Sequence, residues 1–338
     1  MQFLYEYGLF LLQAITIVVA ILLAVGGIMG LANRHKHNKG ELEITSLSER
    51  LDHMVEQAQH VLLDKNELKK RHKARKKEQK QQSKNEQAQN KLFVIDFKGS
   101  IDAREVEQLR EEVSAILSVA EDNDEVLVRL ESGGGMVHGY GLAASQLQRF
   151  RDHKIKMTVS VDKVAASGGY MMACVADKII SAPFAIVGSI GVIAQLPNFH
   201  RLLDKNYIDF EQHTAGEFKR TLTLFGKNDD LGRKKFREEL EQVHGMFKDF
   251  VSEHRPKLDI GSVATGEYWY GIKAKTMELV DEIKTSDDFL FAANKERQIY
   301  KVEFKTRKNL AEKLGQSVSV GTESLLDRLW QKLQLPWA

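Results

Sequence analysis

From Leu92 onward the sequence alternates between short apolar runs and amphipathic stretches, and this alternation limits the possible folds more than any other feature. The apolar runs are Leu92–Phe97, Val126–Leu130 and Met157–Val161, and the stretches between them are Ala103–Ala120 and Tyr140–Arg151. The first of these two stretches repeats apolar residues at helical spacing. Strands and helices that alternate at this pace predict parallel βαβ units, in which helices cover the sheet.

Two glycine-rich loops follow strands of the predicted sheet. Ser132–Gly135 comes directly after the second strand, and Ala165–Ala173 follows the third. Parallel sheets bind their ligands beyond the carboxyl ends of the strands, which is where both loops fall. Three successive glycines expose backbone N–H groups and suit an anion or an oxyanion. No Gly-Lys-Ser/Thr follows, so a phosphate-binding loop is not indicated.

The second loop contains a candidate nucleophile. Ser167 lies between small residues at a strand-to-helix turn, which exposes its hydroxyl and lets a substrate backbone approach. The N–H groups at the start of the following helix would stabilise a developing oxyanion. The motif is not Gly-x-Ser-x-Gly, so the elbow of an α/β-hydrolase is not indicated.

A serine nucleophile needs a base, and the residues alone leave that base open. His138, His200 and His213 carry no motif around them. Lys219 follows a small-residue turn after a predicted strand at Ile208–Phe210. A lysine acts as a base only when burial lowers its pKa from about 10.4 by several units. An exposed or salt-bridged lysine is the ordinary alternative.

The N-terminal region has the composition of a membrane anchor. Gly8–Ala32 carries no charge and is mostly Leu, Ile, Val and Ala. A helix of roughly 20 such residues spans a bilayer. A cleaved signal peptide is the alternative, with Gly30–Ala32 as a weak cleavage site. Against it, residues 1–7 contain no Lys or Arg, and the apolar run exceeds the roughly 7–15 residues usual for such peptides.

Residues 33–91 differ in composition from the βαβ region after them. Apolar residues recur three and four positions apart, which predicts either a coiled-coil stalk or an amphipathic helix lying on the body of the protein. They are Ile44, Leu47, Leu51, Met54, Ala58 and Val61. Residues 65–91 are almost entirely polar and strongly basic. A solvated linker, contact with anionic lipid and nucleic-acid binding are the alternatives, and the lack of interleaved aromatic residues disfavours the last.

Charge and cysteine content exclude some classes. Lys and Arg number 49 against 47 Asp and Glu, so the net charge does not point to a partner. The single cysteine, Cys174, rules out an intrachain disulfide framework and a Cys-rich zinc site. Its apolar neighbours predict a buried small hydrophobe.

Two further helices have an apolar side. Leu231–His254 is long and highly charged, and it packs either within the chain or against another copy. Ser324–Leu333 places its leucines and a tryptophan on one face, which fits the membrane, a neighbouring subunit or its own domain.

Several separated motifs occur in an order that resembles a known family. They are the loops Ser132–Gly135 and Ala165–Ala173, then Gly188–Val192, Gly216-x-x-Lys219 and the C-terminal signature Thr265–Asp281. Together they resemble the signal peptide peptidase A family (peptidase family S49), and most of all its short inner-membrane members. The resemblance covers effectively the whole chain.

This resemblance implies a ClpP/crotonase-like fold and a Ser-Lys dyad that uses no cofactor and no metal. Ser167 would be the acylated nucleophile and Lys219, which lies 52 positions later, the base. Ser189 would help to orient the lysine ammonium. The implied oxyanion hole comprises the backbone N–H groups of Gly134, Gly135 and Gly168. The family usually has Ser-Pro-Gly-Gly in the first loop, and Gly133 in place of that proline should make the loop less rigid.

The resemblance also implies an assembly and a location. Family members form rings, and in the short ones the serine and lysine can come from neighbouring subunits. The expected partners are polypeptide substrates, the lipid bilayer and further copies of the chain in a homo-oligomer, but no nucleic acid. The expected location is the bacterial inner membrane with a single span. Arg34, Lys36 and Lys39 favour a cytoplasmic catalytic domain, whereas the family favours the periplasmic face.

The expected organisation is an anchor at residues 8–32, a charged helical stalk or linker at 33–91, a protease domain at 92–305 and a tail with a short amphipathic helix at 306–338. The expected function is a membrane-anchored serine endopeptidase acting on unstructured polypeptides or signal-peptide remnants. The alternatives are a catalytically silent membrane scaffold of the same fold and a crotonase-type acyl-CoA lyase, which would need neither Ser167 nor an anchor.

Overall fold

The computed structural model describes residues 40–71 and 90–306, together with Gly8, Gln13, Thr16 and Lys73. In this part of the chain a seven-stranded sheet has the order β1-β10-β2-β3-β4-β6-β9, and every pairing from β10 to β9 is parallel. The chain is therefore mixed α/β with a large, mostly parallel sheet. The strands are β1 Gly40–Ser46, β2 Lys91–Lys98, β3 Glu125–Glu131, β4 Lys156–Val161, β6 Lys178–Ser181, β9 Glu282–Ile283 and β10 Gln298–Thr306.

A second, smaller sheet lies beyond the carboxyl ends of these strands. It consists of β5 Val164–Ala166, β7 Ile186–Gly188 and β8 Tyr268–Tyr270 in the order β5-β7-β8. Strands β5 and β7 are parallel, and β8 runs antiparallel to β7. An isolated parallel bridge between Ser132 and Ala165 joins the end of β3 to β5. The small sheet thus connects both glycine-rich loops.

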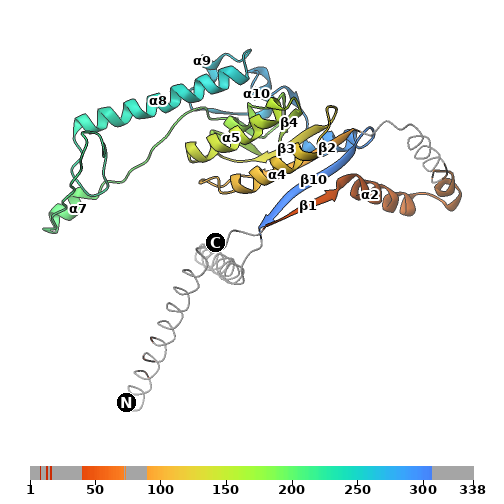
Figure 1. The fold of residues 1–338 in the computed structure, drawn as a ribbon, viewed down its shortest axis with the longest axis horizontal. Helices are drawn as coiled ribbons and strands as arrows, with labels where there is room; N and C mark the ends of the chain where they lie inside the picture. Colours follow the sequence, from red (N-terminus) through yellow and green to blue (C-terminus); the bar gives the residue numbers. More distant parts are fainter. Residues whose placement is uncertain are drawn as a thin grey trace, which may run out of the picture. The chain divides into compact units, whose positions relative to one another are not determined.

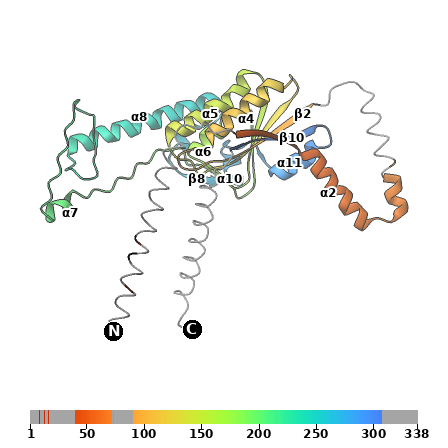
Figure 2. The same ribbon diagram turned by 60° about the horizontal axis from the view of Figure 1, so that its bottom comes forward.

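Helices cover both faces of the large sheet, as Figures 1 and 2 show. Because strand side chains alternate between faces, Phe93 and Ile95 point to one side and Leu92 and Val94 to the other. The first side packs against α4 Val106–Val119, α5 Val137–Asp152 and α6 Gly168–Ala173. The second packs against α2 Leu47–Leu62 and α11 Ser286–Ala293. Burial on both faces explains the near-continuous apolar runs of these strands.

The segment expected to form a helical stalk is divided between a strand and a helix. Ile44 lies in β1, a neighbour of β10 in the sheet, so its assignment to the helical seam was wrong. Leu47 and Leu51 of α2 pack on the second face of the sheet, which supports a helix lying on the body there. Val61, near the end of α2, is 86% exposed. The compact unit Leu42–Phe304 therefore takes in part of the expected stalk.

A long helix and an irregular arm follow the small sheet. The predicted helix Leu231–His254 is confirmed as α8 Asp230–His254, which begins where the Asp229 side chain accepts a hydrogen bond from the Gly232 amide. Residues 193–229 form the arm, which reaches away from the sheet and contains α7 His200–Lys205 (Figure 1). The strand expected at Ile208–Phe210 is wrong, because these exposed residues pair with no strand within residues 40–71 and 90–306.

Two short helices complete the fold, and one prediction about the core is confirmed. They are α9 Ile260–Val263 and α10 Gly271–Thr276. Cys174, which follows α6, is fully buried in the main apolar cluster, as expected of a small hydrophobe.

Several expectations about the termini fall beyond the described residues. The predicted anchor at 8–32 lies outside them except for Gly8, Gln13 and Thr16, and so does the predicted helix Ser324–Leu333. Within the described part of the chain, no helix is both long and apolar enough to cross a bilayer.

Candidate active site

Backbone hydrogen bonds bring three separate segments together around Ser167. The amide of Ser132 donates to the Val164 carbonyl at 2.9 Å, and the Ala166 amide donates to the Ser132 carbonyl at 3.0 Å. The Ser167 amide donates to the Gly188 carbonyl at 2.8 Å. The first glycine loop, the serine turn and the end of β7 are therefore fixed to one another by main-chain bonds.

Ser167 has an unusual backbone conformation for a residue with a side chain. Its φ is 52° and its ψ is −120°, and it occupies the position immediately before α6. A non-glycine residue in such a region costs about 1–3 kcal/mol, and strained residues of this kind concentrate at active sites. Its side chain does not cap α6, so the hydroxyl is not used to hold the helix. Ser167 is half-buried in this turn.

The glycines beside Ser167 permit contacts that any side chain would block. Gly134 has a φ of 88°, and a Cβ on it would lie 2.7 Å from the Cβ of Ser167. A Cβ on Gly135 would lie 2.0 Å from the Ile101 carbonyl oxygen. Gly133, by contrast, faces open space. Two of the three loop glycines are therefore required by close packing.

The amides expected to form an oxyanion hole differ in what they bind. The Gly134 amide donates to the Ser132 hydroxyl at 3.1 Å, so in this conformation it is already engaged. Within residues 90–306, the amides of Gly135 and Gly168 donate no hydrogen bond. Gly168 lies directly against Gly134, because a Cβ on Gly134 would be 2.8 Å from its nitrogen. Gly135 and Gly168 are thus the free donors among the three predicted residues.

Sequence reasoning missed Tyr140, which lies beneath this site at the start of α5. Its ring is fully buried, and its hydroxyl donates to the Ser100 carbonyl at 2.8 Å and lies 2.5 Å from the Ser132 hydroxyl. Burial raises the pKa of Tyr140, so the phenol stays protonated and can donate. Its place on the buried side of a predicted helix, a few residues after the glycine loop, was the available signal.

Ser189 is held near Ser167 through the turn that follows β7. Its φ is 53°, and its amide donates to the Glu267 carbonyl at 2.6 Å. Gly188 rests on Trp269, because a Cβ on Gly188 would lie 2.9 Å from the indole ring. Residues of the C-terminal signature therefore support the turn whose Gly188 carbonyl accepts a hydrogen bond from the Ser167 amide. The predicted role of Ser189 toward the lysine stays a prediction.

Other residues of the same signature bond to α6, to β6 and to the end of α8. Tyr170 donates its hydroxyl to the Leu279 carbonyl at 3.1 Å. Asp281 accepts hydrogen bonds from Arg255 at 2.7 and 2.9 Å and from the Ile179 amide at 2.7 Å. Burial disfavours the ionised carboxyl, but these hydrogen bonds outweigh it and lower the pKa of Asp281. This part of the signature is structural.

Lys219 is not brought to Ser167 within the described chain. It lies on the exposed arm, in a turn where its amide donates to the Gly216 carbonyl at 3.2 Å and where Gly216 has a φ of 98°. Its side chain lines an open hollow of about 700 Å³ whose apolar residues include Leu222 and Phe225. The structure therefore separates the predicted nucleophile from its predicted base.

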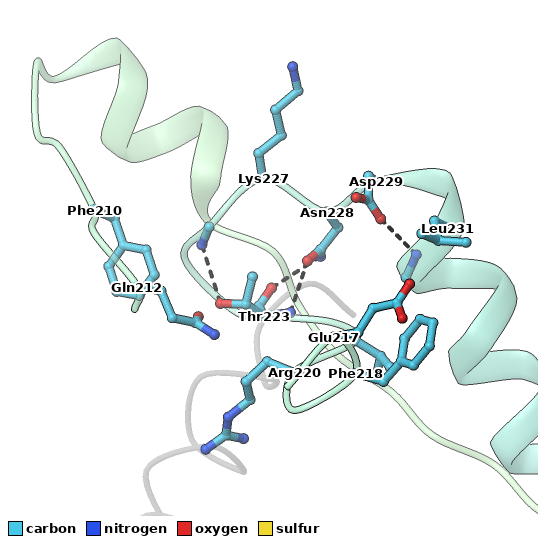
Figure 3. Close-up of a pocket in the computed structure, with 13 residues that line it drawn as sticks. Phe210, Gln212, Glu217, Phe218, Arg220, Thr223, Lys227, Asn228, Asp229 and Leu231 are labelled. Atoms are coloured by element: carbon cyan, nitrogen blue, oxygen red, sulfur yellow. Dashed lines mark hydrogen bonds between the residues drawn. The ribbon is translucent and has the colours of Figure 1, made fainter. Parts of the chain in front are cut away.

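A second hollow on the arm, of about 330 Å³, shows how the lysine segment is supported (Figure 3). Its wall is a turn in which the Thr223 amide donates to Asn228 at 2.9 Å and the Asn228 side chain donates back to the Thr223 carbonyl at 3.1 Å. Glu217 and Arg220, which flank the lysine turn, line the same hollow. These bonds close the last turn of the arm just before α8 begins.

The three histidines that were alternatives for the base do not complete the site either. His138 is exposed on α5, His200 begins α7, and His213 lies 3.3 Å from Glu211 and lines the same hollow as Lys219. Within residues 90–306, the Ser167 hydroxyl has no hydrogen bond to any of them. The structure thus brings together Ser167, the glycines and Ser189, and it leaves the base apart.

Comparison with known proteins identifies the family of this chain. The model of the peptidase family S49 N-terminal region matches residues 2–147, and the model of peptidase family S49 matches residues 149–300. The two matches together cover most of the sequence, and the second contains the serine turn and the lysine turn. The resemblance drawn from the motifs is confirmed.

Individual relatives give the same result. A probable protease SohB of Haemophilus influenzae is 50% identical over 334 residues, which is 95% of each chain. A probable protease SohB of Buchnera aphidicola (subspecies Acyrthosiphon pisum) is 57% identical over 243 residues, or 72% of each chain. Another, from the subspecies Schlechtendalia chinensis, is 48% identical and covers 86% of this chain and 100% of its own. By its motifs, its sheet and these relatives, the chain belongs to peptidase family S49.

Proposed function

We propose that this protein is a membrane-anchored serine endopeptidase that hydrolyses peptide bonds of unstructured polypeptides or signal-peptide remnants. Ser167 is its nucleophile and Lys219 its base. The observation that carries the proposal is the strained Ser167 turn, which is bonded to Gly188 and packed against Gly134. Membership of a peptidase family supports the reaction class.

In this mechanism the Ser167 oxygen attacks the carbonyl carbon of the substrate while the Lys219 amine takes its proton. The free amides of Gly168 and Gly135 stabilise the oxyanion that forms, and Gly134 contributes if its loop turns. The lysine then passes the proton to the leaving amine, and water hydrolyses the acyl-enzyme. No cofactor or metal enters this sequence of steps.

A neighbouring copy completes the site in this proposal. Lys219 lies exposed on an arm with several half-exposed apolar side chains, among them Phe199, Leu224 and Phe225. A lysine serves as a base only where burial favours its neutral form. Packing of the arm against another copy would bury both the apolar residues and the lysine. The proposal therefore includes assembly as a condition of activity.

The proposed membrane anchor is the uncharged stretch Gly8–Ala32 with its basic flank. A direct measurement determines on which side of the membrane the catalytic domain lies. A reporter that is active on only one side, fused after Lys91, is expected to be active on the side of the catalytic domain. Cytoplasmic activity would follow the flanking charges, and periplasmic activity would follow the family.

Mixing two inactive variants tests the dyad and its placement together. Ser167→Ala and Lys219→Ala are each expected to lose hydrolysis of a fluorescent casein. If the dyad forms between copies, a co-assembled mixture in equal amounts should recover up to about a quarter of wild-type activity, since that share of sites receives both intact residues.

Each outcome of this experiment is informative. Activity that survives in either single variant contradicts the dyad. Inactive single variants with no recovery in verified mixed assemblies would place both residues in one chain. His213→Ala serves as the matched control, because His213 lines the same hollow as Lys219 and should leave most activity in place.

A further inference from the structure

We propose that Tyr140 and Ser132 are positioning residues that hold the glycine loop and the residue after Ser167 at the spacing an oxyanion hole needs. The inference rests on the proposed function, because it assigns a role within the same site. Neither residue contacts the reacting atoms. Both act through a chain of hydrogen bonds and through packing beneath the loop.

The hydrogen-bond chain runs from the glycine loop into the core. The Gly134 amide donates to the Ser132 hydroxyl at 3.1 Å, and the Tyr140 hydroxyl donates to the Ser100 carbonyl at 2.8 Å. Since the phenol hydrogen is used on Ser100, the Ser132 hydroxyl donates to the phenol oxygen across the 2.5 Å between them. Every hydroxyl in the chain thus both donates and accepts.

The chain is buried, so losing one member has consequences. Tyr140 is 0% exposed and Ser132 is 1% exposed. A buried polar group whose partner is removed pays the full cost of its lost hydration, whereas a surface group finds water. Main-chain hydrogen bonds hold the backbone of Ser132, but its hydroxyl, which accepts from the Gly134 amide, depends on the phenol oxygen for its orientation.

The ring of Tyr140 contacts the other half of the site. A Cβ on Gly168 would lie 2.4 Å from Cγ of Tyr140, so Gly168 rests directly on the ring. A Cβ on Gly99 would lie 2.4 Å from the phenol oxygen, which places the end of β2 against the same side chain. One tyrosine therefore touches the residue after the nucleophile, the glycine loop and the neighbouring strand end.

This arrangement separates two functions of the side chain. The ring fills space under Gly168, and the phenol hydroxyl orients the Ser132 hydroxyl and through it the Gly134 peptide. Donors of an oxyanion hole act because they are fixed before the charge develops, so looseness in the loop weakens the transition state more than the bound substrate. The hydroxyl should consequently affect kcat and not KM.

Removing only the phenol oxygen tests this directly in the full chain. Tyr140→Phe keeps the ring, and we expect kcat for a quenched fluorescent peptide to fall by about 10-fold while KM changes by less than about 2-fold. Ser132→Ala, which breaks the chain at its next member, should show the same split.

Tyr170→Phe is the matched control. Tyr170 is also 0% exposed and also donates its hydroxyl to a backbone carbonyl, that of Leu279, but it makes no bond to the glycine loop. We expect it to lower the melting temperature about as much as Tyr140→Phe does and to keep kcat within about 2-fold. An equal loss of kcat in both variants, or a change confined to KM, would overturn the proposal.

Amide hydrogen exchange gives a readout that does not depend on activity. The peptide covering residues 132–136 should exchange faster in Tyr140→Phe than in wild type and should be unchanged in Tyr170→Phe. Unchanged exchange with unchanged kcat overturns the positioning role. A failure of the proposed function would give a different result, because Ser167→Ala would then be as active as wild type. Amide exchange in the loop would still show whether the hydrogen-bonded hydroxyls of Tyr140 and Ser132 hold the loop in place.

Discussion

At the scale of single residues, adjacent glycines of one loop are expected to differ sharply in tolerance. Gly134 has a φ of 88° and has no room for a Cβ beside Ser167, whereas Gly133 faces open space and its amide donates no hydrogen bond within residues 90–306. We expect Gly134→Ala to lower peptide hydrolysis at least about 100-fold, comparable to loss of an oxyanion donor. Gly133→Ala should keep it within about 2-fold.

Gly133 is also the position at which this chain departs from the proline usual in the family, and that departure can be tested. Gly133→Pro restores the usual Ser-Pro-Gly-Gly, costs no hydrogen bond within the described residues, and should leave activity unchanged or raise it. Initial rates and melting temperatures measured side by side would check all three variants. An active Gly134→Ala protein, or an inactive Gly133→Pro protein, would show that the loop does not lie as described.

At the scale of elements, α2 is expected to be anchored at its beginning and not at its end. Leu51 packs on the sheet with Leu92 and Leu127, while Val61 is 86% exposed. Leu51→Ala should lower the free energy of unfolding by about 1.5 kcal/mol, somewhat less than for a fully buried leucine, and Val61→Ala by less than about 0.5 kcal/mol. Urea denaturation measures both, and equal losses would favour a self-associating seam.

Elements that are determined by the local sequence pattern could be predicted from the sequence, whereas elements that depend on partners far along the chain could not. The expected strand Met157–Val161 appears as Lys156–Val161, since its apolar residues fall at every second position, which is the period of a strand. Ile44 was placed in a helix because no local signal reveals that its neighbour is β10, more than 250 positions away. Ile208–Phe210 has strand-like residues, but the described part of the chain provides no strand that pairs with them. In the site, Ser167 and the glycines followed from their motifs, whereas Tyr140 acts through contacts that only the fold creates.

At the scale of the whole molecule, one buried carboxyl should make stability depend on pH. Glu112 of α4 is 5% exposed and accepts a hydrogen bond from the Phe304 amide of β10 at 2.9 Å. Burial raises the pKa of Glu112 to about 7, and nearby Glu303 adds to the effect. The folded state therefore holds a proton that the unfolded chain releases near pH 4.5, so stability falls as pH rises between those values.

Glu112→Gln removes this ionisation and keeps an acceptor for Phe304. We expect the variant to exceed wild type in free energy of unfolding by about 3 kcal/mol at pH 8, with the difference vanishing at pH 4. Urea titrations across this range measure the effect. Glu111→Gln, an exposed neighbour on the same helix, is the control and should follow wild type. A difference independent of pH would contradict the assignment.

The distance between the serine turn and the lysine arm has a consequence for how such a protein would be switched on. If each site draws its two reacting groups from different copies, the specific activity follows mass action, and a dispersed chain is inert whatever its own integrity. Tethering the copies to a common surface raises their effective concentration without any change in affinity. Dilution and confinement would then govern proteolysis as directly as an inhibitor does.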